Sequence, residues 1–229
     1  MNLSRLPLLL AALFLIVPSA AQAETFHPDA KIFIHLTPDS EERRLNCYTH
    51  GVESAATDAK VTGEVSDKNG YYAYILVSGV NTEVGITGVQ FGIAYDPEEN
   101  SGVDIDYWQD CALMEWHEDD WPQAGAGNLL TWNQENGCQK DEVIVVGFFH
   151  LYAHSPDQFR IIPRPVDDKA LVAACGLTPQ NYKDYVSVFK PENMGRVGFG
   201  GKDGYNPADP KQNLLDIKKG FKRLKGSGN

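Results

Sequence analysis

The clearest hydrophobic pattern of the chain lies in two neighbouring stretches. Residues 71–80 are rich in β-branched and aromatic side chains, and residues 88–95 alternate between large apolar and small or polar positions. Alternation with a period of two is typical of a strand with one buried face. The pattern therefore predicts two adjacent strands of one sheet. Val89, Phe91 and Ile93 would face a core that a second layer covers.

Shorter stretches of the same kind recur along the chain, separated by turn-forming residues such as those at 67–70. Residues 142–154 are apolar on both faces, which predicts a central strand buried on two sides. Alternation from residue 103 onward places Val103, Ile105 and Tyr107 toward the core. The other predicted strands are 31–36, 61–65, 128–132, 159–162, 170–174 and 186–189, with 111–116 as an extension of the strand at 103–108.

These elements together predict an all-β protein, a two-layer antiparallel β-sandwich with a short C-terminal helix. Residues 24–207 would form the sandwich as one domain, a length that all-β domains commonly reach. Within residues 212–225, apolar side chains recur at approximately helical spacing. Residues 208–229 are accordingly expected to form a basic amphipathic tail.

The N-terminal 23 residues have the features of a secretory signal peptide. Arg5 is followed by an apolar run over residues 8–17, and residues 21–23 read Ala-Gln-Ala, a typical cleavage site. The apolar run is shorter than the roughly 20 residues that a membrane-spanning helix needs. The sequence therefore predicts a secreted or periplasmic, extracytoplasmic protein that is not inserted in the membrane after cleavage.

Charge is distributed unevenly along the chain. Residues 211–229 contain six basic residues and one acidic residue, whereas residues 24–210 contain 13 basic and 30 acidic residues, a net charge of −17. An acidic body of this kind repels the phosphates of nucleic acids and anionic lipids. Nucleic acid is therefore not an expected partner, and the tail is expected to contact the acidic body.

Four cysteines lie in the exported part of the chain, which indicates two disulfides. If the strands at 103–108 and 128–132 are antiparallel neighbours, Cys111 and Cys138 lie at adjacent strand ends. We therefore expect a Cys111–Cys138 bond, and by elimination a Cys47–Cys175 bond.

Several acidic residues are candidates for chemistry. Asp104 and Asp106 are spaced to point the same way on a strand, and residues 118–120 are Glu-Asp-Asp. In an acidic body such residues most often form a solvated face, but paired carboxylates also bind Ca²⁺ or hydrolyse glycosides. His150 and His154 would lie about 13 Å apart on a strand, too far to share a metal ion. No metal ligands are assigned, and calcium is the one cofactor considered.

The four tryptophans all fall between residues 108 and 132. Exposed indole rings stack on sugars and anchor protein interfaces, while buried ones pack in the core, the role expected for at least two of the four. The loop at 117–127 is long and rich in acid, Gly and Trp, which is unusual for a plain connection. The residues assigned to a binding surface are Trp116, Trp121, Trp132, Asp119 and Asp120.

Parts of the sequence resemble known sandwich proteins. Residues 77–96, with Gly-Val-Gln-Phe-Gly-Ile-Ala-Tyr-Asp at their end, are similar to the opening of cohesin-like sandwiches, and residues 145–151 are similar to their long buried strand. Residues 31–207 also resemble uncharacterised secreted bacterial β-sandwich proteins, which share the Gly-Val-Gln-Phe-Gly strand, a Trp-Pro loop and a Gly-Tyr-Asn-Pro segment. The cohesin-like or immunoglobulin-like resemblance implies the sandwich fold and binding of a partner module, but it assigns no functional residue.

The sequence thus predicts an exported, non-catalytic structural or binding module that recognises a protein or glycan at a cell surface or matrix. Two other functions stay open at this point. One is a carbohydrate-active hydrolase that uses Asp104, Asp106 or the acids at 118–120, and the other is a calcium-stabilised adhesion domain.

Overall fold

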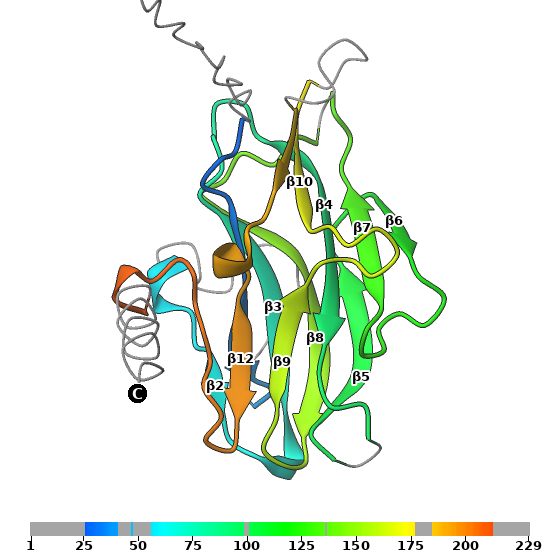
Figure 1. Ribbon diagram of the computed structural model, residues 1–229, viewed down its shortest axis with the longest axis vertical. Coiled ribbons are helices and arrows are strands. Elements are labelled where there is room, and N and C mark those ends of the chain that lie inside the picture. The colour runs from blue at the N-terminus through cyan, green and yellow to red at the C-terminus, as the bar shows by residue number, and fades with distance from the viewer. Residues whose placement is uncertain are drawn as a thin grey trace, which may run out of the picture.

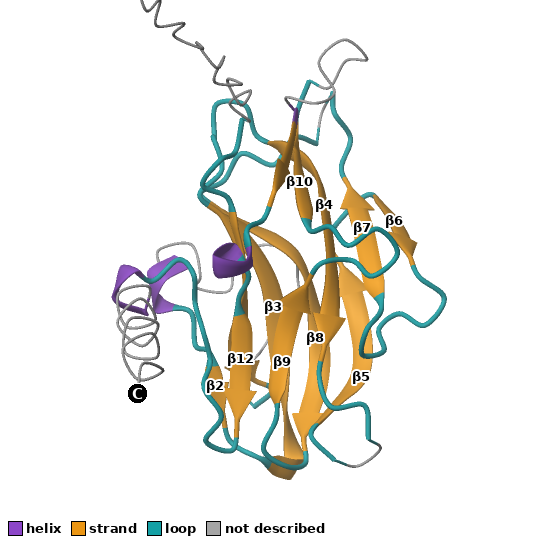
Figure 2. Cartoon of the chain, in the orientation of Figure 1, coloured by secondary structure: helices purple, strands orange, loops and turns teal. Residues whose placement is uncertain are grey.

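The computed structural model describes residues 26–40, 47, 56–98, 101–135, 137–176 and 185–212. Two β-sheets pack face to face, with two short 3-10 helices, η1 (Ala56–Asp58) and η2 (Pro191–Asn193), in the connections (Figures 1 and 2). The predicted fold class, an all-β two-layer sandwich, is confirmed.

The smaller sheet has four strands in the order β1-β3-β8-β5. Their bounds are β1 (Lys31–Pro38), β3 (Ser66–Ser78), β8 (Val143–Ala153) and β5 (Val103–Asp110). All three pairings are antiparallel. β8 lies between β3 and β5 and is largely buried, so the prediction of a central strand at 142–154 is confirmed.

The larger sheet follows the order β11-β10-β4-β9-β12-β2, and β7 and β6 extend it beyond the other side of β4 (Figure 1). The strands are β11 (Val186–Val188), β10 (Leu171–Ala174), β4 (Ile86–Ala94), β9 (Gln158–Ile162), β12 (Arg196–Phe199), β2 (Thr62–Gly63), β7 (Gly127–Thr131) and β6 (Met114–His117). β12 and β2 pair in parallel, while the other ladders of this sheet are antiparallel.

The core lies between the two sheets and is built from the alternate residues that the sequence pattern identified. Val89, Phe91 and Ile93 of β4 are fully buried. The rings of Phe149 on β8 and Phe159 on β9 lie 5.1 Å apart edge to face, which joins the two layers. Burial of each such ring contributes on the order of 2 kcal/mol through the hydrophobic effect.

The two most clearly patterned stretches belong to different layers. β3 lies in the smaller sheet and β4 in the larger one, so the prediction that they are neighbours in one sheet is wrong. The connection at residues 79–85 leads the chain from the smaller sheet to the larger one. Asn81 Oδ1 accepts hydrogen bonds from the amides of Glu83 and Val84 and so turns the backbone. Residues 67–70 also differ from prediction, since they belong to β3 as an irregular segment in which Ser66 Oγ accepts the amides of Lys68 and Asn69.

A β-bulge in β5 changes which of its side chains face the core. The register with β8 shifts between Ile105 and Tyr107, so that Asp106 is an extra residue. As a result Tyr107 faces away from the core and Trp108 faces into it, 4.4 Å from the Phe149 ring, contrary to the predicted alternation. Residues 114–117 do not extend β5 but form β6 of the larger sheet.

All four cysteines form disulfides, but the predicted pairing is wrong. The bonds join Cys47 to Cys111 and Cys138 to Cys175, with Cα atoms 5.4 Å and 6.0 Å apart. The prediction placed the strands before Cys111 and Cys138 in one sheet, whereas β5 and β7 lie in different sheets. Two disulfides indicate an oxidising environment.

The C-terminal helix expected at 212–225 lies outside the described residues except for Gln212. Within the described part of the chain, no helix has the length and apolar character needed to cross a bilayer.

His27 connects the start of the chain to the crossover between β3 and β4. Its buried imidazole accepts a bond from the Asn81 amide at Nδ1 (3.1 Å) and donates from Nε2 to the Gly85 carbonyl (3.2 Å). These partners fit the neutral ring. Burial lowers the pKa of His27 below the usual value, and the bond to Gly85 opposes this shift only in part.

We expect this histidine to make stability depend on pH. As the pH falls, the unfolded chain protonates His27 near pH 6.5, whereas the folded chain does so only at lower pH. The free energy of unfolding should therefore fall as the pH drops below about 6.5. Urea unfolding between pH 7.5 and 5.5 measures the effect. His27→Gln, which cannot titrate, should show a smaller decrease over the same range. An equal decrease in both proteins would show that other groups cause it.

Candidate functional site

The outer face of the larger sheet carries apolar side chains on β6, β7, β10 and β11, with the small or polar row of β4 between them. Val89, Leu130 and Val172 point into the core, so the residues that alternate with them on β4, β7 and β10 point outward. The outward row includes Leu129 and Leu171. It continues onto both margins, where Trp116 lies opposite Leu129 and Val188 lies opposite Leu171. This face is therefore continuous from β6 to β11.

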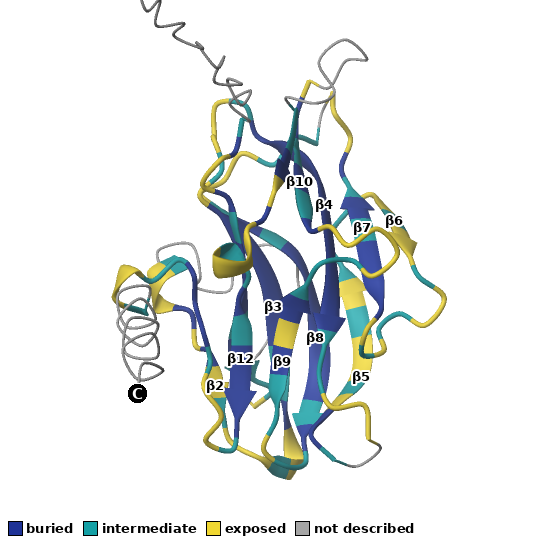
Figure 3. Cartoon of the chain, viewed as in Figure 1, coloured by how far each residue is buried: buried dark blue, intermediate teal, exposed yellow. Residues whose placement is uncertain are grey.

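The centre of this face is hollowed into a cleft of about 540 Å³, here called the apolar cleft. Gly88 forms part of its floor, and the missing side chain leaves the space open between Thr131 and Ala173. Leu113 and Met114 at its margin are 64% and 52% exposed, and β6 appears as an exposed strand beside the buried β7 (Figure 3). Its other apolar lining side chains are Leu129, Trp132, Leu171, Ala173 and Val186.

Polar side chains at the cleft are largely hydrogen-bonded to other groups of the protein. Thr87 Oγ1 donates to the Trp132 carbonyl (2.8 Å), and Gln90 Nε2 donates to the Asp167 carboxylate (2.9 Å) and the Lys169 carbonyl (3.1 Å). Asn133 Oδ1 accepts from the Glu135 amide at the rim. The cleft thus offers a ligand mainly aliphatic surface, which favours apolar contacts over sugar hydroxyls.

The structure separates the tryptophans that the sequence grouped together. Trp116 is 48% exposed on β6, beside the apolar cleft. Trp132 is buried, and its Nε1 donates to the Cys111 carbonyl (2.9 Å) while its side chain borders the cleft. Trp121 packs against the core, 5.5 Å from the rings of Trp108 and Phe149. The expectation that at least two tryptophans serve the core is confirmed.

The acids of the loop at 117–127 do not converge on one site. Asp119 and Asp120 are exposed. Glu118 instead holds the loop in place, because its carboxylate accepts the amides of Gly127 (3.0 Å) and Val166 (3.2 Å) and lies 3.4 Å from Arg164 Nε. Glu118 thus joins the segment at 164–166 to the first residue of β7.

Asp104 and Asp106 lie on the smaller sheet, on the outer face of the sandwich. Asp106 Oδ2 is 3.0 Å from His150 Nδ1, and Asp104 Oδ2 is 3.5 Å from His154 Nε2. Two carboxylates that each face a histidine differ from the pair of acids that flank the scissile bond in glycosidases. Tyr107 stacks on His150, and burial, the Tyr72 hydroxyl and the Asp106 charge together raise the pKa of Tyr107 to about 12.

Of the residues assigned from the sequence, Trp132 lines the apolar cleft and Trp116 lies opposite the lining residue Leu129. The other lining residues Leu171, Ala173 and Val186 come from short strands that carry no distinctive motif. The available signal was the small or polar row of residues 88, 90 and 92 on β4, which marked an outward face. In the part of the chain that is described, no group of three or more His, Cys, Asp or Glu side chains is arranged to hold a metal ion.

No protein-family model and no curated protein matches the chain. Solved structures similar to it are cohesin modules. One belongs to a family 33 glycoside hydrolase of Clostridium perfringens, with 12% identity and a TM-score of 0.41 over 61% of this chain and 89% of that one. Another is a type I cohesin of Clostridium thermocellum in complex with a dockerin, with 7% identity and a TM-score of 0.44 over 78% and 97%.

A third similar structure is the sixth cohesin of scaffoldin B from Acetivibrio cellulolyticus, with 12% identity and a TM-score of 0.39 over 64% of this chain and 90% of that one. These modules are of the kind that residues 77–96 resemble in sequence. Likeness at this level is confined to the β-sandwich and does not extend to function.

Proposed function

We propose that this chain is an exported, non-catalytic binding module that recognises a protein partner through the apolar cleft. The observation that carries the proposal is the exposure of Leu113, Met114 and Trp116 around a cleft of about 540 Å³. Soluble proteins seldom expose contiguous apolar surface of this kind without a partner for it. The signal peptide expected at residues 1–23 and the two disulfides support an extracytoplasmic role.

The chemistry of the cleft favours a polypeptide over a glycan. Sugar sites combine exposed aromatic faces with free hydrogen-bonding groups, whereas this cleft is lined mainly by aliphatic side chains and the amide nitrogen of Gln90 is already bonded. The acidic body, with a net charge of −17 over residues 24–210, favours a partner whose apolar anchor is flanked by basic residues. The proposed ligand is therefore an apolar peptide segment with basic flanks.

A displayed library of random peptides, selected against the full chain in its oxidised form, tests the proposal. We expect enriched peptides to carry one or two large apolar residues beside Lys or Arg. Met114→Asp should weaken the binding of these peptides at least tenfold, because it places an unpaired charge at the apolar contact. Val65→Asp is the matched control, since Val65 is an exposed apolar residue that does not line the cleft.

Two results would contradict the proposal. Peptides that bind Met114→Asp as tightly as the parent chain would place the interaction elsewhere. A glycan array that gives a specific ligand lost on Trp116→Ala, with no peptide enriched, would show that the face recognises sugars instead.

A further inference from the structure

A second cluster of functional side chains lies on the opposite side of the sandwich, on the outer face of the smaller sheet. Phe149 and Leu151 of β8 point into the core, so the alternate residues Tyr152 and His154 project outward. The strands on both sides of β8 add acidic residues to this face. This face contains a pocket of about 410 Å³, which is lined by Asp67, Asp104, Ile105, Asp106, Tyr152 and His154.

Within this pocket the imidazole of His154 lies between two carboxylates. Its Nδ1 is 2.8 Å from Asp67 Oδ1 on β3, and its Nε2 is 3.5 Å from Asp104 Oδ2 on β5. A neutral imidazole carries one N–H group, so it can donate to only one of the two. The short contact assigns that proton to Nδ1 and the bond to Asp67. The lone pair of Nε2 then faces a carboxylate at a distance beyond a normal N–H···O bond.

We propose that His154 Nε2 and Asp104 bind a divalent transition-metal ion of the Zn²⁺ type, with Asp67 orienting the imidazole. A nitrogen lone pair and a carboxylate oxygen that face each other repel, and a cation between them removes this repulsion. With zinc–nitrogen and zinc–oxygen bonds of about 2.1 Å and a tetrahedral angle, two ligand atoms lie about 3.4 Å apart. The observed separation of 3.5 Å matches that arrangement.

Asp67 supplies the outer contact that metal-binding histidines commonly have. A carboxylate that accepts the Nδ1 proton fixes the tautomer in which Nε2 is free, and it holds the orientation of the ring. The imidazole ligand selects a transition metal over Ca²⁺, which takes oxygen ligands. His154 is largely buried, with its side chain 18% exposed, whereas Asp104 is half exposed. The ion would therefore be held from one side and reached from solvent on the other.

Two protein ligands leave further coordination positions for water or for a group from a partner. The site is accordingly expected to bind metal reversibly rather than as a permanent structural ion. Because His154 directly follows β8 and Asp104 belongs to β5, the ion would join these two strands at one end of the sheet, where Asp67 of β3 already contacts His154. Metal binding should therefore raise the melting temperature.

The neighbouring His150–Asp106 pair provides an internal control. His150 also contacts a carboxylate, at 3.0 Å, through the same ring nitrogen that His154 uses toward Asp67. Its Nε2, however, lies close to Gly70, and the ion pair of His150 with Asp106 uses Nδ1 alone. The His150→Gln variant thus removes a similar histidine–carboxylate pair on the same face without changing a residue that lines the pocket.

Calorimetric titration of the full, tag-free chain with ZnCl₂ at pH 7.5 tests the site. We expect one site, lost in Asp104→Asn, weakened about 10- to 100-fold in Asp67→Asn, and unchanged in His150→Gln. The ¹⁵N resonance of His154 Nε2 should shift on addition of Zn²⁺, which distinguishes this site from metal bound by other histidines.

The proposal is overturned if Asp104→Asn binds zinc like the parent chain, or if no site is detected at millimolar Zn²⁺. It is also overturned if lowering the pH raises the melting temperature while zinc leaves the melting temperature unchanged. In that case a proton rather than a metal ion lies between His154 and Asp104.

Discussion

Replacing Trp121 by alanine should lower the free energy of unfolding by about 3 kcal/mol, which is typical of removing a large aromatic side chain from a packed cluster. Although it lies in a loop, the Trp121 ring contacts the rings of Phe91, Trp108 and Phe149 at centroid distances of 5.5–5.7 Å. Its loss would leave a cavity between the two sheets at the point where both contribute aromatic residues. Urea unfolding monitored by circular dichroism measures the change.

Trp116→Ala is the matched control for this substitution. Trp116 is 48% exposed on β6, so its truncation should change the free energy of unfolding by no more than about 0.5 kcal/mol. The same variant should weaken binding of the selected peptides, since Trp116 borders the apolar cleft. If the two variants unfold at the same urea concentration, Trp121 does not pack as described.

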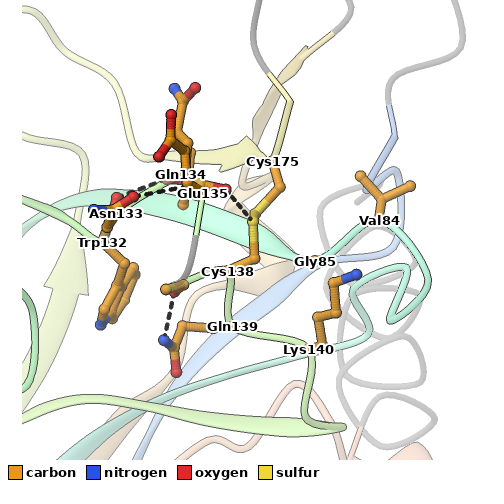
Figure 4. The surroundings of a disulfide bond; sticks show 12 residues. Val84, Gly85, Trp132, Asn133, Gln134, Glu135, Cys138, Gln139, Lys140 and Cys175 are labelled. Carbon is orange, nitrogen blue, oxygen red and sulfur yellow. Dashed lines mark hydrogen bonds between the residues drawn. A yellow bond between two sulfur atoms is a disulfide. The ribbon is translucent and has the colours of Figure 1, made fainter.

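Removal of the Cys138–Cys175 disulfide by a double alanine substitution should lower stability by about 4 kcal/mol, the loop-closure estimate for cysteines 37 residues apart. The bond joins the connection after β7 to the end of β10, and Trp132 and Asn133 of the cleft rim lie close by (Figure 4). We therefore expect peptide binding at the apolar cleft to weaken together with stability. Denaturant unfolding without reductant and peptide titration measure the two effects.

The Cys47–Cys111 double alanine variant separates the two effects. It should lose a similar amount of stability, because its cysteines are 64 residues apart. The contact of Cys111 with the cleft residue Trp132 is made by its backbone carbonyl, which alanine retains, so binding per folded molecule should be kept. Peptide mapping without reduction that recovers a Cys111–Cys138 linkage would refute the bonding pattern on which both expectations rest.

Local alternation predicted the strands well and their arrangement poorly. Phe91 was assigned to the core because its neighbours in sequence determine which face of a strand it occupies. Tyr107 was assigned wrongly because a single extra residue at Asp106 reverses every later position, and no turn-forming residue marks the bulge. Which sheet a strand joins depends on long-range pairing, so the placement of β3 and β4 in different layers could not be read from their own patterns.

The candidate site was only partly predictable for the same reason. Trp116 lies in a strand and Trp121 in a loop, and a loop residue has no periodicity that indicates where its ring points. The cysteine pairing failed because it assumed that the strands before Cys111 and Cys138 were neighbours. The apolar cleft requires β6, β7, β4, β10 and β11 to be assembled before their outward residues become one surface.

The disulfides join the four cysteines in the order in which they occur, first with second and third with fourth. A polypeptide threaded N-terminus first into an oxidising compartment presents Cys47 and Cys111 before the later pair arrives. An enzyme that oxidises thiols as they emerge thus makes the native bonds without first making wrong ones that must be exchanged. Recombinant export of this chain should accordingly require a thiol oxidase but no disulfide isomerase.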